Sequence, residues 1–105
     1  DGQGLSKIPI KFNIINGNFN ISGNYLTTLE NVPTKINGNF YASTNNLTNL
    51  IGFPKYVSGI SRLIYNPLES LDGFNADYNR LSCHNRDNLI KKHKRKQKLK
   101  QLYEL

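Results

Sequence analysis

Few side chains in this sequence have the types and spacing that catalysis or metal binding requires. Cys83 and His84 could act as nucleophile and base, but neighbours in an extended segment point to opposite faces. His93 adds a third zinc-ligand type, without the paired spacing of a structural zinc site. The carboxylates are scattered, and no phosphate-cradling loop of the Walker or dinucleotide-binding type occurs. The sequence therefore predicts a protein that is not an enzyme and that uses no cofactor or metal ion.

Basic side chains gather near the C-terminus. The chain carries 14 Lys and Arg against 7 Asp and Glu, a formal net charge of +7. Half of the basic residues follow Ile90, namely Lys91, Lys92, Lys94, Arg95, Lys96, Lys98 and Lys100. Such a run suits the phosphates of nucleic acid, an acidic protein, an anionic membrane surface, or solvent alone. Because no aromatic residue interrupts the run, nucleic-acid binding through it would be sequence-independent and salt-sensitive.

Asparagine recurs at a fixed interval in the rest of the chain. Asn24, Asn45 and Asn66 are 21 residues apart. Apolar columns keep the same period: Leu5, Leu26, Leu47 and Leu68; Ile8, Leu29, Leu50 and Leu71; and Ile15, Ile36 and Val57. A fixed period of this length is typical of stacked structural repeats. We expect the Asn column to be structural, with each amide turned inward onto backbone groups of adjacent turns.

The elements that would position these residues follow from one period. "GNFYASTNNL" places Phe40 and Ala42 two residues apart, the spacing of a short strand that buries alternate residues. In "LTTLENVPTKI" the apolar residues are three apart and Pro33 excludes a long helix. Each period is therefore predicted to hold one strand, a turn, and a return leg that is a helical turn, a 3₁₀ turn or irregular.

The same columns resemble a leucine-rich repeat, whose pattern is L-x-x-L-x-L-x-x-N-x-L. "F19-N-I21-S-G-N24-Y-L26" and "F40-Y-A42-S-T-N45-N-L47" supply its second half. The variant with "GNF" before the strand is similar to short repeats in proteins of tailed bacteriophages related to the T-even group, over about residues 5–90. The resemblance implies an α/β fold, a solenoid of three to four 21-residue coils with one short strand each. It also implies a viral accessory protein that engages a host or virion component.

Residues between the buried strand positions should form an exposed face, the usual binding surface of curved repeats. They are Asn18, Asn20, Ser22, Asn39, Tyr41, Ser43, Ile60, Arg62 and Ile64. Tyr41 and Arg62 are of the types enriched in interface hot spots. The alternative is that these side chains only face solvent on an exposed sheet and bind no partner.

The repeat decays toward its end. Ser61 replaces the Phe of earlier copies, and a register of 21 places Ser82 in the same column of a truncated fourth coil. The segment from Asn85 to the end is predicted to be a helix with Asn85 as its N-cap. We expect Leu89 and Ile90 to dock on the last coil and the rest of the helix to project from it. These features predict a repeat region over 1–84 and a basic helix over 85–105.

The remaining features concern the ends and the compartment. There is no Met, and no cap is visible at the N-terminus, so we expect upstream coils or self-association through the first coil. The single Cys83 excludes an internal disulfide, and neither a membrane span nor a signal peptide is evident. We expect an intracellular location, in host cytoplasm, or a place in the virion.

The sequence leaves three hypotheses for function. The first is non-catalytic binding of a protein through the exposed strand face. The second is sequence-independent association with nucleic acid through the basic helix. The third is a structural role within a larger assembly. Salt dependence would separate the first two hypotheses, because phosphate binding weakens steeply with salt.

Overall fold

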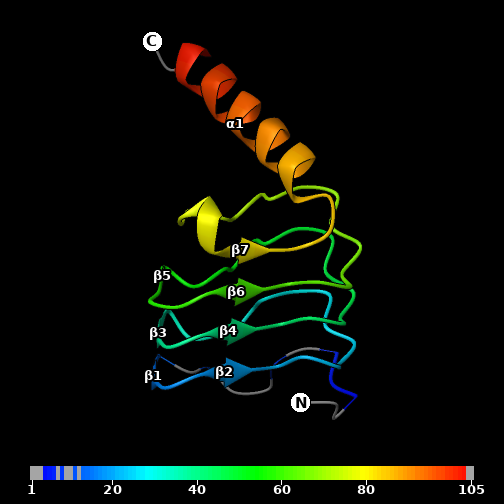
Figure 1. The fold of residues 1–105 in the computed structure, drawn as a ribbon, viewed down its shortest axis with the longest axis vertical. Helices are drawn as coiled ribbons and strands as arrows, with labels where there is room; N and C mark the ends of the chain where they lie inside the picture. The colour runs from blue at the N-terminus through cyan, green and yellow to red at the C-terminus, as the bar shows by residue number, and fades with distance from the viewer. Residues whose placement is uncertain (1–3, 7, 9–10, 12, 104–105) are drawn as a thin grey trace.

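The computed structural model describes residues 4–6, 8, 11 and 13–103. It confirms a mixed α/β chain with parallel strands and a C-terminal helix, α1 (Arg86–Tyr103) (Figure 1). One sheet has the order β1 (Ile14–Asn16), β3 (Lys35–Asn37), β5 (Tyr56–Val57). The other has the order β2 (Phe19–Asn20), β4 (Phe40–Tyr41), β6 (Ser61–Arg62), β7 (Leu81–Ser82). Residues 1–3, 7, 9–10 and 12 of the predicted repeat region, and 104–105 of the predicted helix, lie outside the described residues.

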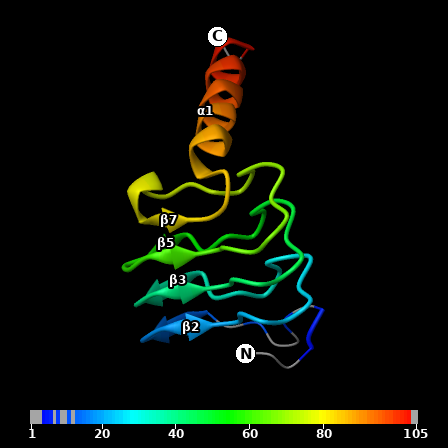
Figure 2. The ribbon, with the colours of Figure 1, turned by 45° about the vertical axis from the view of Figure 1, so that its right-hand side comes forward.

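Each of the first three turns of chain lies directly on the next. Phe19 pairs with Phe40 and Phe40 with Ser61, so strand partners are 21 residues apart. Ile15, Ile36 and Val57 are paired with the same spacing. Figure 2 shows the layers side by side, with α1 beyond the β7 end of the stack. The period read from the sequence is therefore the strand register of the structure.

Each of these turns contains two strands, so the prediction of one strand per period was wrong. The second strand of each pair follows a glycine, Gly17, Gly38 or Gly59. Gly17 has a φ of 124°, and a Cβ on Gly38 would overlap the carbonyl oxygen of Gly17. Glycine thus lets the chain bend between the strands while successive turns remain in contact. The strands that were missed, β1, β3 and β5, have two or three residues with one inward side chain each, which is too few for the alternation that predicted the strand at Phe40.

The return legs contain a repeated β-turn. Backbone N–H groups of Val32, Phe53 and Phe74 each donate to the carbonyl three residues earlier, at 3.2, 3.0 and 2.9 Å. The residues before them, Asn31, Gly52 and Gly73, have φ values of 70°, 93° and 96°. A hydrogen-bonded turn with positive φ at its third residue is a type II turn, which favours Gly or Asn there. The three-residue spacing of apolar residues in the return legs therefore comes from this type II β-turn.

The core is a strip that runs through all the turns. Its fully buried side chains include Leu26, Leu29, Ile36, Phe40, Leu47, Leu50, Leu63 and Leu71. Aromatic rings lie along this strip at centroid distances of 5.0 to 6.3 Å, in the order Phe19, Phe40, Phe53, Phe74, Tyr78. This continuity lets each turn bury its apolar residues against its neighbours.

The last turn is one residue shorter than the others. Ser61 pairs with Leu81, and not with Ser82 as a register of 21 predicted. A 3₁₀ turn at Tyr78–Arg80 lies where the earlier turns of chain have their first strand. The Asp77 carboxylate caps it by accepting from the backbone N–H of Asn79. The one-residue shift exchanges the side chains of the two faces, so that Leu81 is buried.

Candidate macromolecule-binding faces

The inner Asn column is occupied by structural hydrogen bonds. Asn45 Oδ1 accepts from the backbone N–H of Leu26 at 3.1 Å, and its Nδ2 donates to the carbonyls of Ile21 and Ala42 at 3.1 and 3.2 Å. Asn24 and Asn66 accept from the equivalent N–H groups at the same distance. All three side chains are buried. Their amides therefore join adjacent turns and do not face a ligand.

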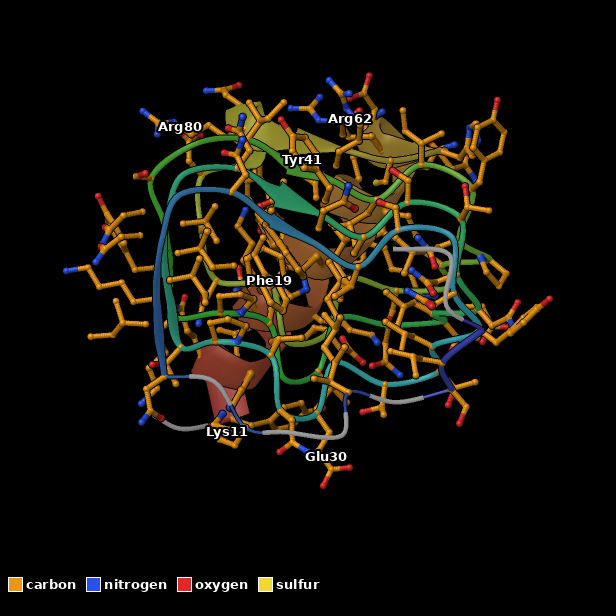
Figure 3. All side chains as sticks on the ribbon, turned by 90° about the horizontal axis from the view of Figure 1, so that it is seen from below. Lys11, Phe19, Glu30, Tyr41, Arg62 and Arg80 are labelled. Carbon is orange, nitrogen blue, oxygen red and sulfur yellow. The ribbon has the colours of Figure 1, made fainter. Side chains whose placement is uncertain are left out.

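The predicted strand face lies on the outside of β2, β4 and β6. We call it the outer strand face, and it comprises Asn18, Asn20, Ser22, Asn39, Tyr41, Ser43, Ile60, Arg62 and Ile64. The structure brings these residues together, each exposed or half-buried. Figure 3 shows Tyr41 and Arg62 on the same side of the body as Arg80, opposite Lys11 and Glu30.

Two of these residues form a second amide ladder that the sequence analysis missed. Asn18 Oδ1 accepts from the backbone N–H of Asn39 at 2.8 Å, and Asn39 Oδ1 accepts from that of Ile60 at 2.9 Å. The ladder ends where the third copy has Ile60. The repeated "GNF" carried the signal, because both Asn residues directly follow the bend glycine. These amides stabilise the stack and are not free recognition groups.

Other polar groups of the outer strand face are also bonded to one another. Asn39 Nδ2 donates to Tyr41 Oη at 2.8 Å, and Ser43 Oγ donates to the Arg62 carbonyl at 3.3 Å. The Arg62 guanidinium lies 5.7 Å from the centre of the Tyr41 ring. None of the ion pairs among the described residues involves Arg62. A guanidinium held on an aromatic ring is well placed to bind a carboxylate or phosphate with two hydrogen bonds.

Arg80 extends this basic side but is held more firmly. Its guanidinium donates to the Ser58 carbonyl and lies 3.9 Å from Asp77. A pocket of about 260 Å³ beside it is lined by residues of β5 and of the segment before β7. Ligand pockets usually measure roughly 300–1,000 Å³, so this hollow is small for a cofactor.

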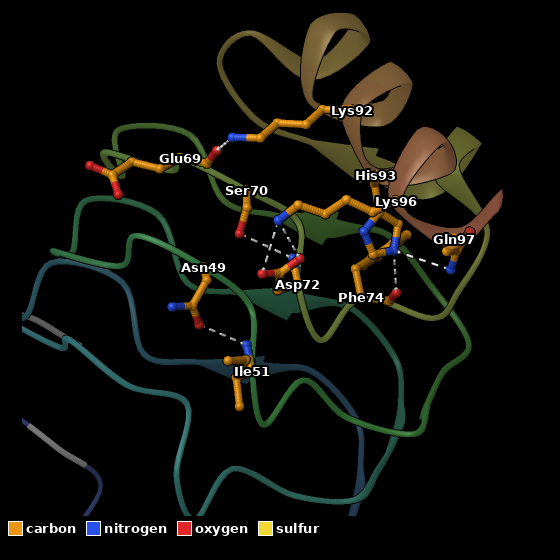
Figure 4. A network of polar contacts seen from close by, with 10 residues as sticks. All are labelled: Asn49, Ile51, Glu69, Ser70, Asp72, Phe74, Lys92, His93, Lys96 and Gln97. Carbon is orange, nitrogen blue, oxygen red and sulfur yellow. Dashed lines mark hydrogen bonds and ion pairs between the residues drawn. The ribbon is translucent and has the colours of Figure 1, made fainter. Parts of the chain in front are cut away.

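Helix α1 docks on the last turn along half its length. Leu89 and His93, one helical turn apart, are both buried, and His93 Nε2 lies 3.1 Å from the Phe74 carbonyl oxygen. Lys92 Nζ donates to the Glu69 carbonyl at 2.8 Å, and Lys96 Nζ lies 3.3 Å from the Asp72 carboxylate; both contacts are drawn in Figure 4. The prediction that α1 projects beyond Ile90 was therefore wrong for the segment up to Lys96.

Helix α1 starts at Arg86, directly after Asn85, which therefore occupies the N-cap position predicted for it. The Asn85 carbonyl accepts from the Leu89 N–H at 3.0 Å, as at a helix start, but Asn85 has a φ of 60°. Its side-chain oxygen accepts from the side-chain amide of Asn88, Nδ2, at 3.3 Å. Arg86 fastens the junction to β7 by donating to the Leu81 carbonyl at 2.9 Å.

Docking divides the predicted basic run between two sides of α1. Lys92 and Lys96 reach the body. The other side carries Lys91, Lys94, Arg95 and Lys98, which line a shallow groove and are exposed, and we call it the outer helix face. Lys94 Nζ lies 5.3 Å from the centre of the Tyr78 ring, at the edge of this face. Lys100 is also exposed, beside the hollow between α1 and Gly73.

Cys83 and His84 have different surroundings. Cys83 packs half-buried against the core, and burial raises the pKa of its thiol, an effect that the nearby positive charge of Arg86 reduces. His84 is exposed, with its ring 5.0 Å from that of Tyr65. No group of three or more His, Cys, Asp or Glu residues able to hold a metal ion occurs in the described part of the chain.

No family model, curated protein or solved structure matches this chain. Among the described residues, no helix combines the length and the apolar composition needed to cross a bilayer.

Proposed function

We propose that this chain is a non-catalytic binding module that recognises a protein partner through the outer strand face. The observation that carries the proposal is the Arg62 guanidinium lying 5.7 Å from the Tyr41 ring, while Tyr41 Oη is bonded to Asn39. Both side chains are held before a partner arrives, so little conformational freedom remains to be lost on binding. Tyr and Arg are also the residue types that most often dominate interface energies.

The surroundings of this pair indicate the chemistry of the partner. Arg62 and Arg80 lie on one side of the body, and no acidic residue belongs to the outer strand face. Ile60 and Ile64 lie exposed and half-exposed on the same turn of chain. The face therefore suits an acidic protein surface that offers a carboxylate to Arg62 and an apolar side chain to Ile60.

We also propose a more specific fold class for the stacked turns of chain. Strand partners 21 residues apart and the inner Asn column are features expected of a short leucine-rich-repeat solenoid. With the resemblance to repeats of T-even-related phages, we infer a viral accessory protein that engages a host or virion protein. Its place would then be the host cytoplasm or the virion.

The test compares two pairs of substitutions with similar chemistry on different sheets. Tyr41→Ala/Arg62→Ala removes the proposed anchor. Lys35→Ala/Tyr56→Ala removes another cation–ring pair, at 5.4 Å, from β3 and β5. Each variant is used for affinity capture from nuclease-treated bacterial lysate. We expect the first variant to lose a protein that the wild type and the second variant retain. Equal retention by both variants would contradict the proposal.

A further inference from the structure

The docking of α1 fixes which side of the helix faces solvent. Leu89 and His93 are buried against the last turn, and Lys96 pairs with Asp72 on the same side. At 3.6 residues per turn, Lys91, Arg95 and Lys98 lie within about 60° of one another on the opposite side. The outer helix face is therefore held outward by contacts on the reverse side of α1, and of its own cations only Lys94 lies near the body, at the Tyr78 ring.

The positive charge of this face is not neutralised within the described chain. Asp87 is the only acidic residue of α1 as described, and it lies 3.1 Å from Arg86 at the helix start. The three ion pairs among the described residues involve none of Lys91, Lys94, Arg95 and Lys98. These side chains thus present an uncompensated positive patch.

We propose that the outer helix face binds the phosphodiester backbone of double-stranded nucleic acid, independently of sequence. From Lys91 to Lys98 the face extends about 10 Å along the helix axis. A duplex carries one negative charge per roughly 1.7 Å of its axis, so a face of this length meets several phosphates whatever the bases are. This site goes beyond the protein-binding function proposed for the outer strand face and uses different residues.

Other polyanions fit this face less well. A protein interface core is depleted in Lys, whereas three of these four cations are Lys. A helix that inserts into a membrane surface needs apolar residues beside its cations, but the exposed apolar residues of α1, Leu99, Leu102 and Tyr103, all follow Lys98. Single strands are held largely by stacking on aromatic side chains, and the outer helix face contains none. Duplex phosphates need only the charges that are present.

The proposal is tested by fluorescence anisotropy with labelled duplexes of roughly 20 base pairs, in two unrelated DNA sequences and one RNA sequence, between about 50 and 200 mM salt. The test variant is Arg95→Gln/Lys98→Gln. The matched control is Lys35→Gln/Lys55→Gln, which removes the same charge from exposed positions on the body. Circular dichroism melting checks that each variant is folded.

Four phosphate contacts predict that wild-type affinity falls about 150-fold over this salt range, and two contacts predict about tenfold for the test variant. The control should behave as the wild type does, and the DNA sequences should bind alike. Binding to both DNA and RNA duplexes, or to one of them, supports phosphate recognition and identifies the source.

Equal weakening by both variants would overturn the proposal, because net charge alone would then explain binding. It would also be overturned by a more than tenfold preference between the DNA sequences, or by stronger binding to polyglutamate or phosphatidylserine vesicles than to duplex. An absence of duplex binding at the lowest salt concentration would also overturn the proposal.

Discussion

Asn39 on the outer strand face and Arg95 on the outer helix face show two uses of polar side chains. Both ends of the Asn39 amide are bonded, to the Ile60 N–H and to Tyr41 Oη. Arg95 takes part in none of the ion pairs among the described residues. The first face is ordered by its own hydrogen bonds, while the second is held in place from its reverse side.

This difference predicts two kinds of recognition. A face whose side chains are already fixed can select a partner by shape and by short hydrogen bonds. A row of uncompensated cations attracts polyanions over longer distances, and salt weakens that attraction. The two faces should therefore be separable by salt and by substitution.

The largest expected effect concerns the amides that build the stack. Asn45→Ala should lower the free energy of unfolding by about 1–3 kcal/mol, because the Leu26 N–H and two carbonyls lose a buried partner. Asn39→Ala should cost less, because water can reach the exposed Ile60 N–H. Urea melts of both variants measure the difference. An Asn45→Ala midpoint equal to wild type would remove the structural role of the inner column.

A second pair of variants sharpens the division of α1 into two sides. Lys98→Gln should leave stability unchanged and reduce the salt dependence of duplex binding by about one phosphate contact. Lys96→Gln should retain duplex binding and lose less than about 1 kcal/mol of stability, since its ion pair with Asp72 is half-exposed. Anisotropy and thermal melts together give both readouts. An opposite result for the two lysines would mean that α1 docks the other way round.

The smallest expected effect concerns Cys83, which lies between β7 and α1. Because burial raises the pKa of its thiol, less thiolate is present in the folded than in the unfolded chain at any pH near the pKa. Stability should therefore decline slightly as pH rises above the unfolded pKa, and disulfide exchange at about pH 8 should be slower than in urea. Equal rates in both conditions would show that the junction is open.

Features that recur every 21 residues could be predicted from the sequence, whereas features that occur only once could not. The Leu and Asn columns gave the 21-residue register because equivalent residues stack directly. The position of Leu81 could not be found, since the last turn is shortened by one residue in a region without repeats. The docking of Lys92 and Lys96 depends on Glu69 and Asp72, which are distant in sequence and carry no pattern.

The candidate site was predicted in outline only. Side-chain alternation placed Tyr41 and Arg62 outside, but it could not show that their neighbours bond to one another. The reason is that the amides of Asn18 and Asn39 reach backbone groups of the next turn, and those distances depend on the stacking. The outer helix face likewise became distinct from the rest of the basic run only once the docked side of α1 was known.

Binding of a protein by the outer strand face is tested most directly by the affinity of the captured partner for four chains. These are the wild type, Tyr41→Ala/Arg62→Ala, Lys35→Ala/Tyr56→Ala and Arg95→Gln/Lys98→Gln. We expect the Tyr41/Arg62 variant alone to lose more than about tenfold in affinity, which corresponds to a hot spot of at least about 1.4 kcal/mol. A comparable loss in the Arg95/Lys98 variant, with the Tyr41/Arg62 variant unchanged, would contradict this expectation.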